Sequence, residues 1–276
     1  MGQRIAGKSV RGASHIRINR ECQDNHRIQI IGDYTVIAVA DGHGSESCPY
    51  SRNGAKKAVN VFCAVMEELL TRYQGNMDML LTYLNREGDT KVAQAIDKEW
   101  KNRVWSGHLK NKRTVPVADD GSQDKPAVYR QYGTTLLGLL VGPEFIFAFQ
   151  LGDGDILLID DDRVQPVIEG DKILGTETHS LSRMNSWEKA ISMVRTRNVR
   201  QEKPYLYFMS TDGFANSYKS TEEMHKACRE YYDMIREYGF DAVAKSLPEW
   251  LSETSRLGCG DDITVVLSYY EDTGVI

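Results

Sequence analysis

The segment 34–44, YTVIAVADGHG, places the strongest constraint on how this chain folds. Its apolar residues 36–40 follow one another without alternation, and such a run is typical of a strand buried on both faces. The run ends abruptly in Asp41 and His43, each followed by a glycine. Glycine lets the backbone turn sharply and lets a ligand approach it closely. The sequence therefore predicts a central strand with a rigidly aimed polar cluster at its tip, although a simple polar turn would also fit.

Four further carboxylates lie at the ends of other strand-like runs. They are Asp24 before 27–31, Asp153 after 146–151, Asp212 after 206–210 and Asp261 before 263–270. Strand ends at one edge of a sheet converge in space, so we expect these four and Asp41 to share a site. A cluster of aspartates with few histidines or cysteines nearby favours Mg²⁺ or Mn²⁺ over zinc, because these hard cations prefer oxygen ligands.

Five short motifs in this order carry a resemblance to a known family. They are DGHG (41–44), YGTTLLGLLV (132–141), FQLGDGDILLI (149–159), FMSTDGF (208–214) and GDDITVVL (260–267). The series resembles that of the metal-dependent type 2C serine/threonine protein phosphatases, and the opening GASHIRINRECQDN is similar to the form found in bacterial members. The resemblance extends from about residue 12 to residue 270. It implies an α+β fold: a four-layer α-β-β-α sandwich of two mostly antiparallel sheets with helices outside.

The resemblance also implies a set of metal ligands. Asp41 would bridge two ions, and Gly42 would contribute its backbone carbonyl. Asp212 and Asp261 would hold one of these ions, whereas Asp24 would act mainly through bound waters. The cofactors implied are therefore two or three Mg²⁺ or Mn²⁺ ions.

Two further roles follow from the same resemblance. Asp153 looks like the ligand of a third, weaker ion, but an aspartate in a tight Gly-Asp-Gly turn can also serve the turn alone. His43 would be the general acid that protonates the departing serine or threonine oxygen. An unperturbed imidazole has a pKa of about 6.5, which suits that work.

The sequence departs from the family pattern in three places. The usual Ser-Arg is replaced by residues 154–155, Gly-Asp, and the usual Asn after the last ligand is Asp262. Extra negative charge there could tighten metal binding or weaken phosphate binding. Asn19 stands where eukaryotic relatives have the arginine that grips the phosphate. Arg17 and Arg20 lie close enough to substitute for it, although they could equally be solvated strand charges.

Hydrophobic spacing predicts the remaining elements. Helices are expected over 45–73, capped by Ser45 or Ser47, over 77–107 with a break near Gly88, over 220–239 with a Ser220–Glu223 capping box, and from 241 onward with a bend or restart at Pro248. Two short strands are expected within 8–31, with His15 in one of them. Residues 111–126 are expected to form a surface loop, and 169–203 a flap-like segment with a short helix near 186–193.

Composition fits one catalytic domain over residues 1–276, with 41% hydrophobic and 26% charged residues. A net charge of −5 argues mildly against nucleic acid as a partner. The five cysteines include no C-x-x-C pair and suggest free thiols in a reducing cytoplasm. No signal peptide or bilayer-spanning run is evident, so we expect a cytoplasmic protein without a membrane partner.

The resemblance favours a hydrolase that removes phosphate from phosphoserine and phosphothreonine in proteins, using a water activated between two metal ions. Its partner would be a phosphorylated protein, such as a serine/threonine kinase or the target of one. A catalytically weak pseudophosphatase that acts as a binding module is the alternative from another class. Retention of all five acids and His43 favours the enzyme. A small-molecule phosphatase is a further alternative that the sequence leaves open.

Overall fold

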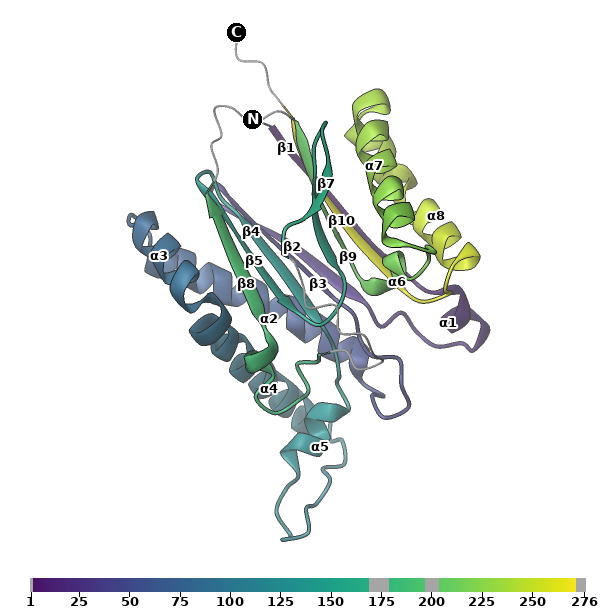
Figure 1. Ribbon diagram of the computed structural model, residues 1–276. Coiled ribbons are helices and arrows are strands. Elements are labelled where there is room, and N and C mark those ends of the chain that lie inside the picture. Colours follow the sequence, from purple (N-terminus) through teal and green to yellow (C-terminus); the bar gives the residue numbers. More distant parts are fainter. Residues whose placement is uncertain (1, 169–178, 197–203, 272–276) are drawn as a thin grey trace.

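The computed structural model describes residues 2–168, 179–196 and 204–271. Within them the strands form two five-stranded sheets that face each other, with helices on both outer faces (Figure 1). The α-β-β-α sandwich and its α+β class, expected from the sequence, are thus confirmed. None of the described helices has the length and apolar character needed to cross a membrane.

Every strand pairing in the two sheets is antiparallel. The first sheet has the spatial order β1 (Gly2–Val10), β10 (Ile263–Glu271), β9 (Tyr205–Ser210), β6 (Asp155–Ile159) and β7 (Val164–Pro166). The second has the order β2 (Asn25–Ile31), β3 (Tyr34–Ala40), β4 (Leu136–Val141), β5 (Phe145–Leu151) and β8 (Ile191–Thr196).

Long helices cover the outer face of each sheet (Figure 1). The second sheet is covered by α2 (Ser51–Arg72), α3 (Met77–Glu87) and α4 (Ala93–Lys110), with a π-helical turn, Gly88–Val92, between the last two. The first sheet is covered by α7 (Thr221–Tyr238) and α8 (Phe240–Leu257). The shorter helices are α1 (Ala13–Arg17), α5 (Lys125–Arg130), α6 (Asp212–Ala215) and a 3₁₀ turn, Ser186–Lys189.

Strand β3 is buried on both faces because it lies between two cores. Val36, Ala38 and Ala40 belong to the core between the second sheet and its helices. Ile37 and Val39 point the other way, into the core between the two sheets. Successive side chains of a strand alternate between its faces, so a strand in an inner layer needs apolar residues at every position. This is the physical reason for the unbroken apolar run in the sequence.

Several local predictions are confirmed. The Ser220 hydroxyl accepts a hydrogen bond from the Glu223 N–H (3.2 Å) at the start of α7. That helix ends at Gly239, whose φ of +86° favours glycine. The break at Gly88 is the π-helical turn.

Other local predictions are wrong. His15 lies in helix α1 and not in a strand, while β1 begins as early as Gly2. Helix α2 begins only at Ser51, and the hydroxyls of Ser45 and Ser47 bond to each other (2.8 Å) instead of capping it. The helix expected near 186–193 is a single 3₁₀ turn followed by β8, and α8 does not restart at Pro248 but continues through it. Residues 169–178 and 197–203 of the flap-like segment lie outside the described residues.

Gly54 offers a test of the packing between α2 and the chain that leads into β4. A Cβ at this position would lie 1.9 Å from the Tyr132 carbonyl oxygen, so Gly54→Ala must displace the helix. Overpacking of this kind costs roughly 1–3 kcal/mol, and we expect urea denaturation to show a loss of that size. Lys56→Ala on the exposed side of the same helix is the matched control and should change stability little. Equal stability of the two variants would contradict this packing.

Candidate metal centre

The tip of β3 is held in place by the chain that enters β4. The Asp41 N–H donates to the Thr135 hydroxyl (3.0 Å), and the Thr135 N–H donates back to the Asp41 carbonyl (2.9 Å). One step further, the His43 N–H donates to the Gly133 carbonyl (3.0 Å). The two motifs therefore act as one unit, in which residues 133–135 fix the backbone that presents Asp41 and His43.

Three carboxylates from three separate motifs converge beside this tip. One oxygen each of Asp41, Asp153 and Asp212 lies within 4.8 Å of the other two. Asp41 follows β3, Asp153 lies in the turn between β5 and β6, and Asp212 opens α6 directly after β9. The turn at Asp153 is possible because its neighbours Gly152 and Gly154 have φ values of +98° and +106°. Both sheets thus contribute to one cluster of charge.

The other two predicted acids lie around this cluster in different environments. Asp24 is buried (4% exposed) and accepts a hydrogen bond from the Thr211 hydroxyl at Oδ2 (2.7 Å). Its Oδ1 is also buried and has no hydrogen-bond partner among the described residues. Asp261 is exposed and lines the same pocket as Asp41, Asp212 and Gly42.

Burial and repulsion from neighbouring carboxylates make Asp24, Asp41 and Asp212 hard to ionise. Burial, followed by the charge of Asp262, raises the pKa of Asp24 to about 8. Burial and the neighbouring Asp153 and Asp261 raise the pKa of Asp212 to about 6. Burial raises the pKa of Asp41 well above its ordinary value, and the surrounding carboxylates add to the effect. Like charges close together disfavour ionisation unless a cation neutralises them.

The cluster fits a divalent cation with oxygen ligands. The side chains that could coordinate an ion are carboxylates. The buried Oδ1 of Asp24 has no hydrogen-bond partner among the described residues. A cation would also neutralise the repulsion between the carboxylates. Mg²⁺ and Mn²⁺ prefer such oxygen donors. Asp41, Asp153 and Asp212 lie at the centre of such a site, with Asp24 and Asp261 at its edge.

Asp41, Asp212 and Asp261 line a pocket of about 1250 Å³, and His43 lines it as well. The imidazole of His43 packs against Gly133, where an added Cβ would lie 2.5 Å from the ring Cδ2. Burial lowers the pKa of His43; Asp153 opposes this shift and Arg183 adds to it. The pocket therefore places a half-buried imidazole beside the acidic cluster.

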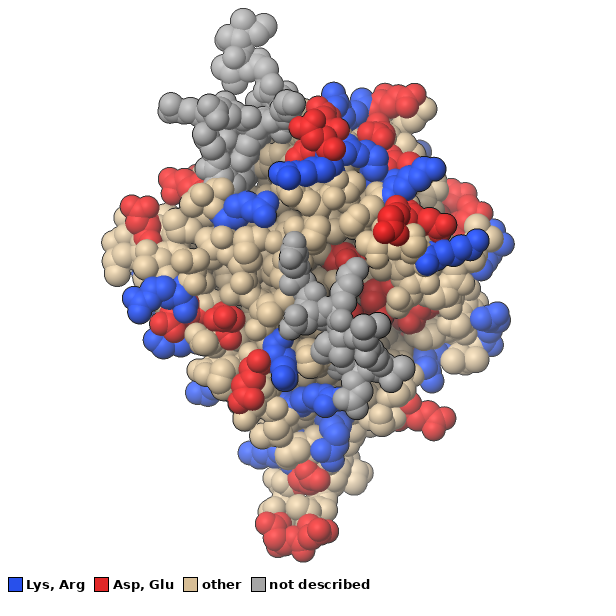
Figure 2. Space-filling view, in the orientation of Figure 1, with Lys and Arg blue, Asp and Glu red and all other residues tan. Residues whose placement is uncertain are grey.

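Arginines line the pocket alongside the acids. Arg20 lies in the pocket and donates to the Gly44 carbonyl, whereas Arg17 is exposed at the end of α1 and is not among the residues that line the pocket. Arg130 and Arg183 also line the pocket, and neither was expected there from the sequence. Arg183 follows the 175–182 motif, GTETHSLS, and could have been noticed there, but nothing in the sequence singles out Arg130. Figure 2 shows acidic residues near the middle of this face and basic residues gathered below them.

The raised pKa values predict how the metal-free protein responds to pH. The unfolded carboxyl groups titrate near pH ~4, whereas Asp212 and Asp24 titrate near 6 and 8 in the folded protein. The folded state therefore binds more protons between these values, and stability must fall as pH rises from 5 to 8. We expect thermal melts in EDTA to show this fall and Mn²⁺ to reverse it most strongly at pH 8.

Asp24→Asn provides the matched comparison for the melts. It removes the ionisation penalty and keeps an oxygen acceptor for the Thr211 hydroxyl. The melting temperature of the variant, relative to that of the wild type at the same pH, should therefore increase as pH rises. Histidines are the same in both proteins, so this difference reports on Asp24 alone. A difference that stays constant between pH 5 and 8 would argue against the raised pKa of Asp24.

Comparison with known proteins places this geometry in a family. The family model described as Protein phosphatase 2C matches residues 11–252. No curated protein matches the sequence significantly. Among solved structures, the catalytic domain of the serine/threonine protein phosphatase PstP, in complex with two manganese ions, is 16% identical with a TM-score of 0.59, covering 98% of this chain and 99% of that chain.

Two further structures share the fold at similarly low identity. The serine/threonine phosphatase of S. agalactiae is 15% identical with a TM-score of 0.57, covering 98% of this chain and 100% of that chain. RsbX in complex with magnesium is 14% identical with a TM-score of 0.53, covering 97% of this chain and 94% of that chain. The match to the family model spans most of the chain, and the chain therefore belongs to the protein phosphatase 2C family of serine/threonine protein phosphatases.

Proposed function

We propose that this chain, as one catalytic domain over residues 1–276, hydrolyses phosphoserine and phosphothreonine in proteins with the help of two divalent cations. The observation that carries the proposal is the convergence of Asp41, Asp153 and Asp212, from three separate motifs, beside a pocket that Asp41, Asp212 and His43 line. Because the chain belongs to the protein phosphatase 2C family, we infer that this site hydrolyses phosphate esters. The surface loop 111–126 and the flap-like segment 169–203 belong to the same proposed domain.

Mg²⁺ or Mn²⁺ is the cofactor that the acidic cluster supports. The structural relatives PstP and RsbX were solved with manganese and with magnesium, respectively. In this chain we assign the ligands to Asp41, the Gly42 carbonyl, Asp212 and Asp261, with Asp24 acting through water and Asp153 reaching a third, weaker ion. When bound, the cations supply charge neutralisation at the phosphate and lower the pKa of a water.

His43 supplies the proton that the leaving group needs. Hydrolysis of a serine or threonine phosphate releases an alkoxide, which is a poor leaving group unless it is protonated. His43 lines the pocket on a backbone fixed by Gly133, and the burial that lowers its pKa makes the imidazolium a stronger acid. We assign it the role of general acid.

Arginines provide the positive charge for the substrate. Arg20 lies beside the DGHG turn, and Arg130 and Arg183 line the same pocket. A guanidinium group matches phosphate oxygens in geometry and charge. We assign phosphate binding to Arg20 and exclude Arg17, which is exposed at the end of α1 and is not among the residues that line the pocket. The substrate would be a phosphorylated protein, such as a serine/threonine kinase or its target.

Asp212→Asn tests the metal-dependent reaction. The wild type should hydrolyse phosphopeptides and p-nitrophenyl phosphate with Mn²⁺, lose activity in EDTA and regain it when Mn²⁺ is restored. Asp212→Asn removes one charge from the cluster and should reduce turnover by orders of magnitude without changing the circular dichroism spectrum. Asp233→Asn on the exposed face of α7 is the matched control. A wild type that binds Mn²⁺ but hydrolyses neither substrate would instead support the pseudophosphatase.

His43→Ala tests the general acid separately. Loss of a general acid slows a reaction by roughly 10²–10⁴-fold, and we expect a loss in this range on phosphopeptides. p-Nitrophenol leaves without protonation, so the loss on p-nitrophenyl phosphate should be much smaller. Equal losses on both substrates would show that His43 binds or positions the substrate and is not the acid.

A further inference from the structure

One part of the pocket wall is formed by α5 and by the loop that leads into it. The residues that line the pocket here are Pro116, Pro126, Ala127, Arg130 and Gln131. They include one charged side chain, the guanidinium of Arg130, and no acid. A negatively charged group of a substrate would therefore meet a cation in this part of the wall and no competing carboxylate.

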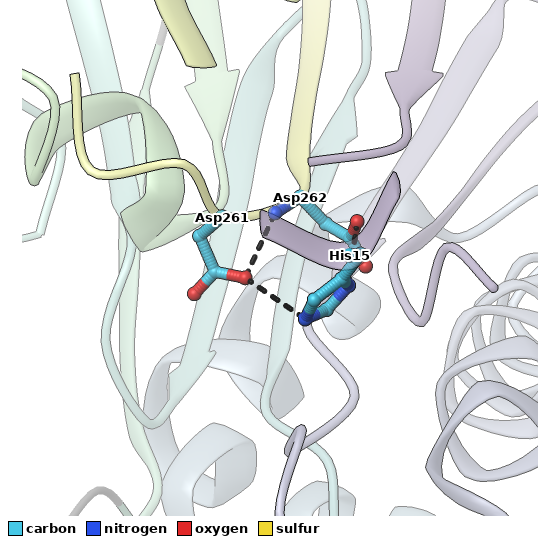
Figure 3. Close-up of side chains that lie close together, drawn as sticks. All are labelled: His15, Asp261 and Asp262. Atoms are coloured by element: carbon cyan, nitrogen blue, oxygen red, sulfur yellow. Dashed lines mark hydrogen bonds and ion pairs between the residues drawn. The ribbon is translucent and has the colours of Figure 1, made fainter. Parts of the chain in front are cut away.

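The acids of the pocket come from other parts of the chain. Asp41 and Asp212 directly follow β3 and β9, and Asp261 lies just before β10. Figure 3 shows Asp261 together with Asp262 and with His15 of α1. Carboxylates repel a further negative charge. A second negative group of the substrate, beyond the phosphate that is removed, is therefore favoured beside α5 and not beside these acids.

The pocket is large enough to admit more than one side chain of a substrate. Its volume is about 1250 Å³, whereas pockets that enclose a drug-sized molecule measure roughly 300–1,000 Å³. A single phosphorylated serine or threonine side chain is smaller than such a molecule. Residues next to the phosphorylated one can therefore enter the pocket as well and reach the wall at α5.

The backbone of Arg130 is fixed close to His43. The Arg130 carbonyl accepts hydrogen bonds from the Gly133 N–H (3.3 Å) and from Sγ of Cys48 (3.1 Å). The Gly133 carbonyl in turn accepts one from the His43 N–H (3.0 Å). Two backbone hydrogen bonds thus connect Arg130 to the proposed general acid, so its side chain starts from a defined point beside the site of reaction.

The guanidinium of Arg130 has capacity for an external anion. Its side chain is 63% exposed, and its single ion pair within the described part of the chain joins Nη2 to Asp124 Oδ2 at 4.0 Å. The other oxygen of Asp124 caps α5 by accepting a hydrogen bond from the Ala127 N–H (2.9 Å). Exposed ion pairs of this kind contribute little, and a guanidinium has five N–H donors. An incoming anion therefore displaces little when it binds Arg130.

We propose that Arg130 recognises an acidic group of the substrate that lies close in sequence to the residue that loses its phosphate. This group is the carboxylate of an aspartate or glutamate or a second phosphate, since both match the fork of a guanidinium. The inference rests on the proposed function and adds a substrate class to it: phosphoproteins with acidic sequence around the phosphorylated residue.

Two substitutions of Arg130 separate recognition of charge from a structural role. Arg130→Gln removes the charge, and Arg130→Glu reverses it. A reversed charge should reverse the preference among substrates, which a structural role would not do. Arg163→Gln is the matched control, because Arg163 is an exposed arginine between β6 and β7 and is not among the residues that line the pocket.

The readout is the ratio of KM values for phosphothreonine peptides that differ only in their flanking residues, which are Glu, Gln or Lys. With saturating Mn²⁺, we expect the wild type to have a KM about 3–5-fold lower for the Glu peptide than for the Gln peptide, the size of an exposed ion pair. The effect should lie in KM and not in kcat, because Arg130 binds a group that does not react.

The variants should change this ratio in different ways. It should fall to about 1 in Arg130→Gln, remain as in the wild type in Arg163→Gln, and give way to a preference for the Lys peptide in Arg130→Glu. A fourth peptide carries a non-hydrolysable phosphonate at the flanking position. A KM below that of the Glu peptide would assign the group to a second phosphate, and a KM above it would assign the group to a carboxylate.

Three results would overturn the inference. Equal KM values for the Glu and Gln peptides in the wild type would remove it, as would a preference for Glu that survives in Arg130→Glu. Equal losses on all peptides, with a lower melting temperature, would make Arg130 a structural residue only. If the wild type hydrolyses no phosphopeptide, the proposed function fails, but fluorescence anisotropy of the same labelled peptides with Mn²⁺ still tests Arg130, because binding needs no catalysis.

Discussion

Repulsion between like charges is the constraint on which the rest of this structure depends. Two carboxylates about 4 Å apart repel each other by roughly 4 kcal/mol near a protein surface, and Asp41, Asp153 and Asp212 approach this distance. Flexible loops would simply move apart. Here Asp41 and Asp212 directly follow strands, and Asp153 lies in a tight turn between two strands. The two face-to-face sheets are therefore the means of holding the charges together.

The same rigidity extends to the N-terminal segment through Asp262. Its carboxylate does not join the acidic cluster, because it accepts hydrogen bonds from the backbone N–H groups of Gly12 and Gln23. It still contributes to the raised pKa of Asp24, after burial. The departure from the family's asparagine thus acts mainly as a brace between α1 and β10. The side chain is 3% exposed, and its charge acts on the acidic cluster through the buried Asp24.

The sequence predicted the sandwich and the acidic cluster because both arise from regular patterns. An apolar run followed by an aspartate indicates a buried strand with an acid at its end, so Asp41 and Asp212 could be found without a structure. His15 could not be placed, because five residues of helix are too short to show periodicity. Nor could Arg130, whose place in the pocket depends on how α5 packs. Pro248 suggested a bend or a restart, but the restart does not occur, because α8 runs through this residue as one helix.

The acids and the arginines of the pocket are supported in different ways. The acids adjoin strands of the inner layers, whereas Arg20 follows α1, Arg130 ends α5 and Arg183 precedes a 3₁₀ turn. Loops and short helices change position at a lower cost than buried strands. The charge that we propose to bind the substrate can therefore differ while the proposed cation site stays the same. Arg20 connects the two parts, because its bond to the Gly44 carbonyl ties a side chain that we propose to bind phosphate to the turn that carries His43.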